Sequence, residues 1–226
     1  MSDFAIFFPT GIEHITDLNG IDHILFVAAL CLRYTFKEWK KILVLVTAFT
    51  IGHSVTLALS TLNILHFSRA WTEFLIAITI LIAAISNLFV KDFSFQKKLP
   101  LIYFYALFFG LIHGLGFSSL LKSMLGIHEN IVIPLLAFNL GLEVGQLVIV
   151  LAVLLISFIF VHLLSINRKD YILFVSGGIA ALALQMAVER FPINNKHNDE
   201  KTAILYRCNN NVFVCESAKH SKQSGL

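Results

Sequence analysis

Several stretches of this 226-residue chain place titratable and amide side chains within apolar sequence. The stretch GIEHITDLNGIDHILF, residues 11–26, holds His14, Asp17, Asp22 and His23. The other candidates are His53 in TAFTIGHSVTLA, His113 in FGLIHGLGFSS, Glu73, and Asn139, Glu143 and Gln146 in FNLGLEVGQ. Imidazole and carboxylate bind Ni²⁺, Co²⁺, Zn²⁺ and Cu²⁺, and the set contains no thiolate. These residue types predict a site that holds a transition-metal dication and can also release it, rather than a closed structural zinc site.

The composition shows which surroundings must position these residues. Hydrophobic residues make up 57% of the chain, charged residues only 14%, and the mean hydropathy is +0.79. The surface of a soluble domain of this length needs far more charge, so we predict an integral membrane protein. A basic patch interleaved with aromatic residues is missing, so we expect no nucleic-acid partner.

The apolar windows predict an all-α, multi-pass bundle of about six transmembrane helices, because about 20 apolar residues span the hydrocarbon core. The predicted spans are Ile21–Tyr34, Ile42–Leu62, Trp71–Val90, Leu99–Leu121, Ile131–Leu164 and Tyr171–Val188. The first is short, so a lead-in from the preceding segment is expected. Residues 1–190 form the predicted transmembrane domain, and the polar residues 191–226 form a predicted disordered tail, with Cys208 and Cys215 available for pairing in an oxidising compartment.

The cations predict the orientation, since short cytoplasmic loops retain Lys and Arg. They follow the first, third and fifth spans: Arg33, Lys37, Lys40 and Lys41, then Lys91, Lys97 and Lys98, then Arg168 and Lys169. The first twenty residues contain acids but no Lys or Arg and are read as a short leader without a signal peptide. We therefore predict a plasma (inner) membrane protein with both termini outside.

Helical spacing indicates which candidates share a face. Asn139, Glu143 and Gln146 form one stripe, while Gly141 and Gly145 fall on the opposite side, where another backbone can approach. With the predicted orientation, all the candidates fall in the outer half of the membrane, as one shared outward-facing site requires.

Each candidate also has a structural interpretation when it is taken alone. Asp22 could cap a helix, and Glu73 could be an acid of the first helical turn at the membrane interface. His53 and His113 could each bond a neighbouring helix. A carboxylate within the membrane has no comparable structural role, which favours function for Glu143.

At GIEHITDLNGIDHILF, TAFTIGHSVTLA, FGLIHGLGFSS and FNLGLEVGQ the chain resembles the HupE/UreJ family of membrane proteins. The resemblance implies a nickel or cobalt permease and carries a histidine, aspartate, histidine motif onto His14, Asp22 and His23. Seven residues separate His14 from Asp22, where hydrogenase-linked members have five, a difference that a loop at the helix entrance can absorb. The resemblance also implies that His53, His113 and Glu143 belong to the metal site.

The leading hypothesis is a permease for a divalent transition metal, with nickel or cobalt as substrate and zinc as another candidate. Its metal residues are His14, Asp22, His23, His53, His113 and Glu143, supported by Asp17, Glu73, Asn139 and Gln146. The alternative is an intramembrane metal-dependent hydrolase of a lipid, amide or ester, with Ser54 or Glu143 in acid and base roles. A structural or sensory subunit is a third class. The expected partners are the lipid bilayer and the metal cation, and self-association into a homo-oligomer stays open.

Overall fold

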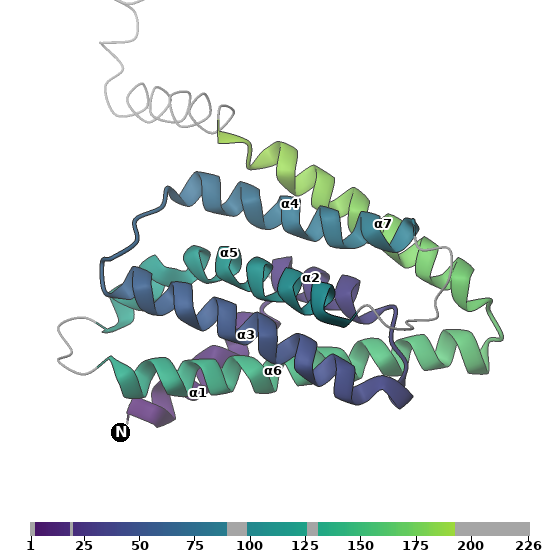
Figure 1. Ribbon diagram of the computed structural model, residues 1–226, viewed down its shortest axis with the longest axis horizontal. Helices are drawn as coiled ribbons and strands as arrows, with labels where there is room; N and C mark the ends of the chain where they lie inside the picture. Colours follow the sequence, from purple (N-terminus) through teal and green to yellow (C-terminus); the bar gives the residue numbers. More distant parts are fainter. Residues whose placement is uncertain (1–2, 19, 90–98, 126–130, 193–226) are drawn as a thin grey trace, which may run out of the picture.

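The computed structural model describes residues 3–18, 20–89, 99–125 and 131–192, which fold into helices and contain no strand (Figure 1). The α-helices are α1 (Asp3–Thr16), α2 (Asp22–Cys31), α3 (Trp39–Thr61), α4 (Arg69–Leu88), α5 (Leu99–Leu125), α6 (Val132–Phe158) and α7 (Arg168–Glu189). A 3₁₀ turn, Phe36–Glu38, precedes α3, and a π-helical turn, Ile159–Leu163, extends α6. The predicted all-α membrane bundle is confirmed.

Four helical stretches are long and apolar enough to cross a membrane: Phe36–Thr61, Arg69–Leu88, Val132–Leu163 and Arg168–Glu189. They correspond to the second, third, fifth and sixth predicted spans. The fourth predicted span lies within α5, whose segment Ile102–Ser118 is apolar as well. The number of about six spans stays a prediction, because the first one differs.

The first predicted span, Ile21–Tyr34, contains only one short helix, α2. At ~1.5 Å per residue, the ten residues of α2 reach only about 15 Å, half of the hydrocarbon thickness. The preceding residues do not form a simple leader, since Asp3–Thr16 folds into α1, which contains Pro9 and packs along the first half of α6. The chain thus enters the bundle through α1, which ends at Thr16, and continues as α2 from Asp22.

The α1–α6 contact is close because glycine faces backbone on both sides. A Cβ atom on Gly141 would lie 2.0 Å from the carbonyl oxygen of Phe8, and one on Gly11 would lie 2.1 Å from that of Phe138. Small residues allow membrane helices to approach in this way, since packing and polar contacts stabilise their association in lipid. The bare face that the sequence predicted at Gly141 and Gly145 is therefore covered by α1.

A second close contact joins α3 and α5. A Cβ atom on Gly110 would lie 2.2 Å from the carbonyl oxygen of Phe49, and one on Gly114 would lie 2.3 Å from that of His53. The glycine-containing face of α5 around His113 is thus covered by α3. Together with the α4–α7 pair, the α1–α6 and α3–α5 pairs surround α2, which packs against α4 and α6 (Figure 1).

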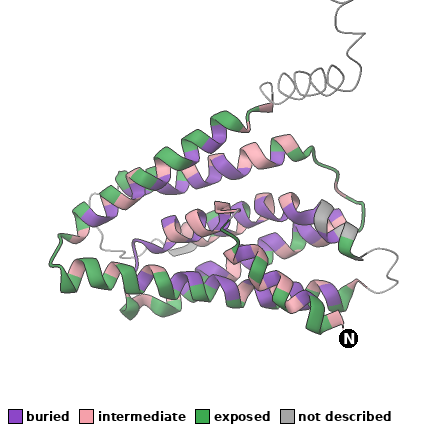
Figure 2. Ribbon diagram, turned by 180° about the vertical axis from the view of Figure 1, so that it is seen from behind, coloured by how far each residue is buried: buried purple, intermediate pink, exposed green. Residues whose placement is uncertain are grey.

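The outward faces of the long helices are apolar and exposed (Figure 2). On α6 they include Leu147, Val148, Leu151 and Leu155. An exposed apolar surface of this extent suits lipid rather than water.

The predicted cytoplasmic cations that the structure describes gather at one end of the bundle, where α2 ends and α3 and α7 begin. There the Arg168 guanidinium donates to the carbonyl oxygen of Arg33. The Arg33 guanidinium donates to the side chains of Ser86 and Asn87 in α4. Lys91, Lys97, Lys98 and nearly all of the predicted tail, including both of its cysteines, lie outside the described residues.

Candidate metal centre

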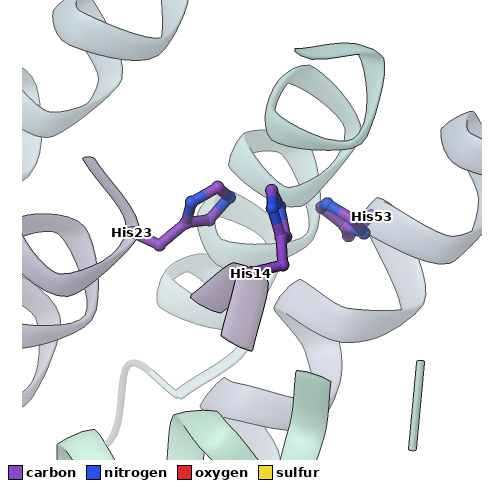
Figure 3. Close-up of side chains that lie close together, drawn as sticks. All are labelled: His14, His23 and His53. Carbon is purple, nitrogen blue, oxygen red and sulfur yellow. The ribbon is translucent and has the colours of Figure 1, made fainter. Parts of the chain in front are cut away.

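Three histidines from three different helices meet in the middle of the bundle (Figure 3). His14 lies in the last turn of α1, His23 in the first turn of α2, and His53 within α3. Their ring centroids are 4.7 Å apart for His14 and His23, 6.1 Å for His14 and His53, and 6.2 Å for His23 and His53. One nitrogen from each ring lies within 4.8 Å of those of the other two. We call these three residues the histidine cluster.

His23 and His53 are buried, His14 is partly exposed, and four ring nitrogens of the cluster are buried without a hydrogen-bond partner. His53 is 0% exposed and His23 is 7% exposed. The buried atoms without a partner include Nε2 of His14, Nε2 of His23 and both ring nitrogens of His53. Leaving one buried polar atom without a partner costs roughly 1–3 kcal/mol, so the fold maintains this arrangement at a considerable free-energy cost. Such a cost is usual at functional sites and unusual in a helix contact.

The donor set fits a transition-metal dication. At metal–nitrogen distances of ~2.1 Å, tetrahedral ligands lie about 3.4 Å from one another. The cluster's nitrogens are separated by up to 4.8 Å, so the rings would draw together by up to about 1.4 Å around an ion. Neutral imidazole suits nickel, cobalt, zinc and copper.

His113 lies directly beside the cluster, on α5. Its ring centroid is 5.2 Å from that of His23. Its Nε2 lies 3.0 Å from the hydroxyl oxygen of Thr79 in α4. That hydroxyl has one hydrogen and donates it to the carbonyl oxygen of Ile76 at 2.7 Å, so it accepts a hydrogen from Nε2. Nδ1 of His113 therefore keeps its lone pair, and it is buried without a partner.

Phenylalanine rings enclose the four imidazoles. The Phe117 ring centroid lies 3.9 Å from that of His14, and Phe138 stacks on His53 at 6.4 Å. On the other side, Phe26 lies 4.9 Å from His113. These rings keep bulk water out and lower the local dielectric constant, which strengthens any ion–ligand interaction.

Acidic residues lie around the cluster but do not share its centre. Among the described residues, the side chains close enough to hold one ion are the three histidines, and neither Asp22 nor Glu143 belongs to that group. The Asp22 carboxylate accepts two bonds from Arg190, and Glu73 pairs with Arg69 at 2.7 Å. Direct binding by Asp22 or Glu143 stays a prediction and requires their side chains to move.

The polar stripe of α6 turns toward α3. The Thr47 hydroxyl donates to Oε1 of Glu143 and the Thr50 hydroxyl to Oε1 of Gln146, both at 2.8 Å. Asn139 donates its amide hydrogen to the carbonyl oxygen of Leu135 in its own helix. The stripe therefore lies beside the helix that presents His53, with threonines as its described partners.

A surface hollow of about 610 Å³ adjoins the cluster where α1 ends. Its lining includes Glu13, His14, Asp17 and Phe117, so one cluster ligand borders it directly. Two carboxylates near its wall favour a cation over an anion.

His23 packs within the bundle at the start of α2. Its ring lies beside that of His113, whose own partner Thr79 lies in the middle of α4. The helix α1, which precedes α2, packs on α6 and brings His14 to the same place. The position of Asp22 and His23 at the outer entrance of a span stays a prediction.

Sequence reasoning missed Thr79, Phe117 and Arg190. Thr79 and Phe117 are ordinary residues of an apolar helix and carry no signal of their own. Arg190 does carry a signal in the sequence, since it is a cation at the end of the last span, opposite the loops that are rich in cations.

The sequence matches the model of one protein family, described as HupE / UreJ protein, over residues 1–190. The matched range contains all four histidines of the site and ends at Arg190. A search of curated proteins and a search of solved structures each found no match.

Proposed function

Because the chain belongs to the HupE/UreJ family, which is known for nickel and cobalt transport-related function, we propose that it is a membrane permease for a divalent transition metal. Nickel or cobalt is the proposed substrate. The observation that carries the proposal is the convergence of three imidazoles, each from a different helix, with one nitrogen of each ring within 4.8 Å of the others and with unpartnered buried nitrogens on all three rings.

In this proposal His14, His23 and His53 bind the ion, and His113 is the next ligand along the path. Thr79 fixes the hydrogen of His113 on Nε2 and so presents the Nδ1 lone pair toward the bundle interior. Second partners of this kind orient metal-binding histidines and tune their affinity. An all-imidazole site binds a dication through neutral ligands, which favours release over permanent retention.

The hollow at the end of α1 is the proposed entrance. Glu13 and Asp17 concentrate cations there, and His14 borders the hollow while also belonging to the cluster. Phe117 packs on His14 at this boundary and separates the hollow from the deeper rings.

The driving force must come from outside the chain's own chemistry, as the sequence has no G-x-x-x-x-G-K-[ST] phosphate loop. A potential of 100 mV contributes about 4.6 kcal/mol to inward movement of a dication, twice the ~2.3 kcal/mol per unit charge. With the orientation predicted from the cations, the ion moves from outside into the cytoplasm across the plasma membrane.

The test is calorimetric binding of Ni²⁺, Co²⁺, Zn²⁺ and Cu²⁺ to the full chain in detergent. His53→Ala removes a buried ligand and is expected to abolish binding, while His162→Ala, an exposed histidine near the end of α6, serves as the matched control. Binding that both variants retain would refute the site.

Uptake into proteoliposomes then separates the permease from the hydrolase. The acid and base candidates of the hydrolase make their described hydrogen bonds to threonines of α3 and not to the histidine cluster. Ser54 donates to the Thr50 carbonyl oxygen, and Glu143 accepts from Thr47. Metal uptake that His53→Ala abolishes supports the permease. Ester or amide turnover without uptake would replace it with the enzyme.

A further inference from the structure

A bidentate ion pair holds the carboxylate next to the histidine cluster. Nη1 of Arg190 donates to Oδ2 of Asp22 at 2.7 Å, and Nη2 donates to Oδ1 at 3.1 Å. The two side chains are largely shielded from solvent, with 28% and 15% of their surfaces exposed. Both oxygens of Asp22 are therefore engaged by one guanidinium in the geometry that makes such pairs strong.

Asp22 is next to His23 in the first turn of α2, so its carboxylate is the acid adjacent in sequence to a cluster ligand. A dication in the cluster attracts that carboxylate strongly, since charge attraction is larger in a water-poor interior. The guanidinium competes with the ion for the same two oxygens.

Arg190 is held firmly enough to compete. It follows the last residue of α7, and its backbone N–H donates to the carbonyl oxygen of Met186 at 3.0 Å. The next residue, Phe191, packs edge to face on Phe74 of α4 with centroids 5.3 Å apart. This contact anchors the end of α7 against α4.

We propose that Arg190 is a positioning residue that keeps the Asp22 carboxylate out of the histidine cluster and so weakens metal binding enough for release. This inference rests on the proposed function of the cluster as the metal site. Without Arg190, Asp22 becomes an additional anionic ligand, and the ion is held more tightly and leaves more slowly.

The test is the Arg190→Gln variant of the full chain, titrated with Ni²⁺ alone. The dissociation constant is expected to fall about tenfold or more, while the rate of Ni²⁺ uptake into proteoliposomes decreases. Adding Asp22→Asn in the Arg190→Gln background is expected to abolish the gain. Arg190→Lys, which keeps the charge but loses the bidentate geometry, should give an intermediate affinity.

A purely structural ion pair predicts the opposite sign, because removing it would loosen α2 and weaken binding. Unchanged or weaker binding by folded Arg190→Gln and Arg190→Lys overturns the inference while the cluster stays a metal site. If Arg190→Gln fails to fold, Arg190→Lys is the test: tighter Ni²⁺ binding than in the wild type supports the inference, and unchanged or weaker binding overturns it. Absence of binding in the wild type overturns the proposed function instead.

Discussion

Replacing Gly114 by alanine should disturb the proposed metal site through the backbone of α3, without changing a ligand side chain. Gly114 lies on α5 against the backbone of α3 at His53. A Cβ atom there would lie 2.3 Å from the His53 carbonyl oxygen and 2.3 Å from Oγ1 of Thr56. Ordinary contacts of Cβ atoms begin at 3.4 Å, so α3 must retreat by about 1 Å at His53, a member of the histidine cluster.

The size of the effect follows from that displacement. Overpacking of this kind typically costs about 1–3 kcal/mol of stability. Binding constellations tolerate only about 0.5 Å of misplacement, so a shift of about 1 Å in His53 should weaken Ni²⁺ binding tenfold or more. Thermal unfolding in detergent measures the first effect, and calorimetry measures the second.

Gly177→Ala on α7 is the matched control, because a Cβ atom there meets nothing within 4 Å. Removing a mid-helix glycine without a clash should leave stability unchanged or raise it by about 0.5–1 kcal/mol, with unaltered Ni²⁺ affinity. If Gly114→Ala has the same unfolding temperature and the same Ni²⁺ affinity as the wild type, the close α3–α5 contact does not position His53, and the reasoning fails.

Three further predictions concern the partner of His113, the entrance and the orientation. Thr79→Val keeps the shape but removes the acceptor of the His113 hydrogen, and should weaken Ni²⁺ binding about tenfold, whereas an unchanged dissociation constant would show that the tautomer is irrelevant. Glu13→Gln together with Asp17→Asn should slow metal association more at low salt than at high salt, as measured by stopped flow; equal slowing at both would exclude steering by charge. Cysteine placed at the exposed Lys37, with the tail cysteines changed to serine, should resist an impermeant reagent added outside intact cells, and ready labelling would reverse the predicted orientation.

The helix faces that pack on a neighbouring helix could be predicted from residue spacing alone. The spacing of Gly141 and Gly145 predicted a helix face that another backbone can approach, and α1 occupies it. The spacing of Glu143 and Gln146 predicted one polar stripe, and both side chains accept from threonines of the same neighbouring helix. Such features are predictable because helical periodicity alone determines which residues share a face.

Contacts between distant segments could not be predicted in this way. The pair of Asp22 and Arg190 joins residues 168 positions apart, and nothing in either neighbourhood specifies the other. The helix α1 was missed for a related reason. Asp3–Thr16 is too short for a span and contains Pro9, so packing against the glycine face of α6, rather than its own hydropathy, explains its place in the bundle.

The break between α1 and α2 is what brings His14 and His23 side by side. In a continuous helix, nine residues at ~1.5 Å each would separate them by about 13.5 Å along the axis, and nine steps of about 100° would put them on opposite faces. Their ring centroids are instead 4.7 Å apart. Irregular backbone at membrane depth is tolerated where protein buries it, and transporters use such breaks to build ion sites. The break between Thr16 and Asp22 also takes up the longer spacing between His14 and Asp22, so the departure from the family's pattern leaves the contact between His14 and His23 intact.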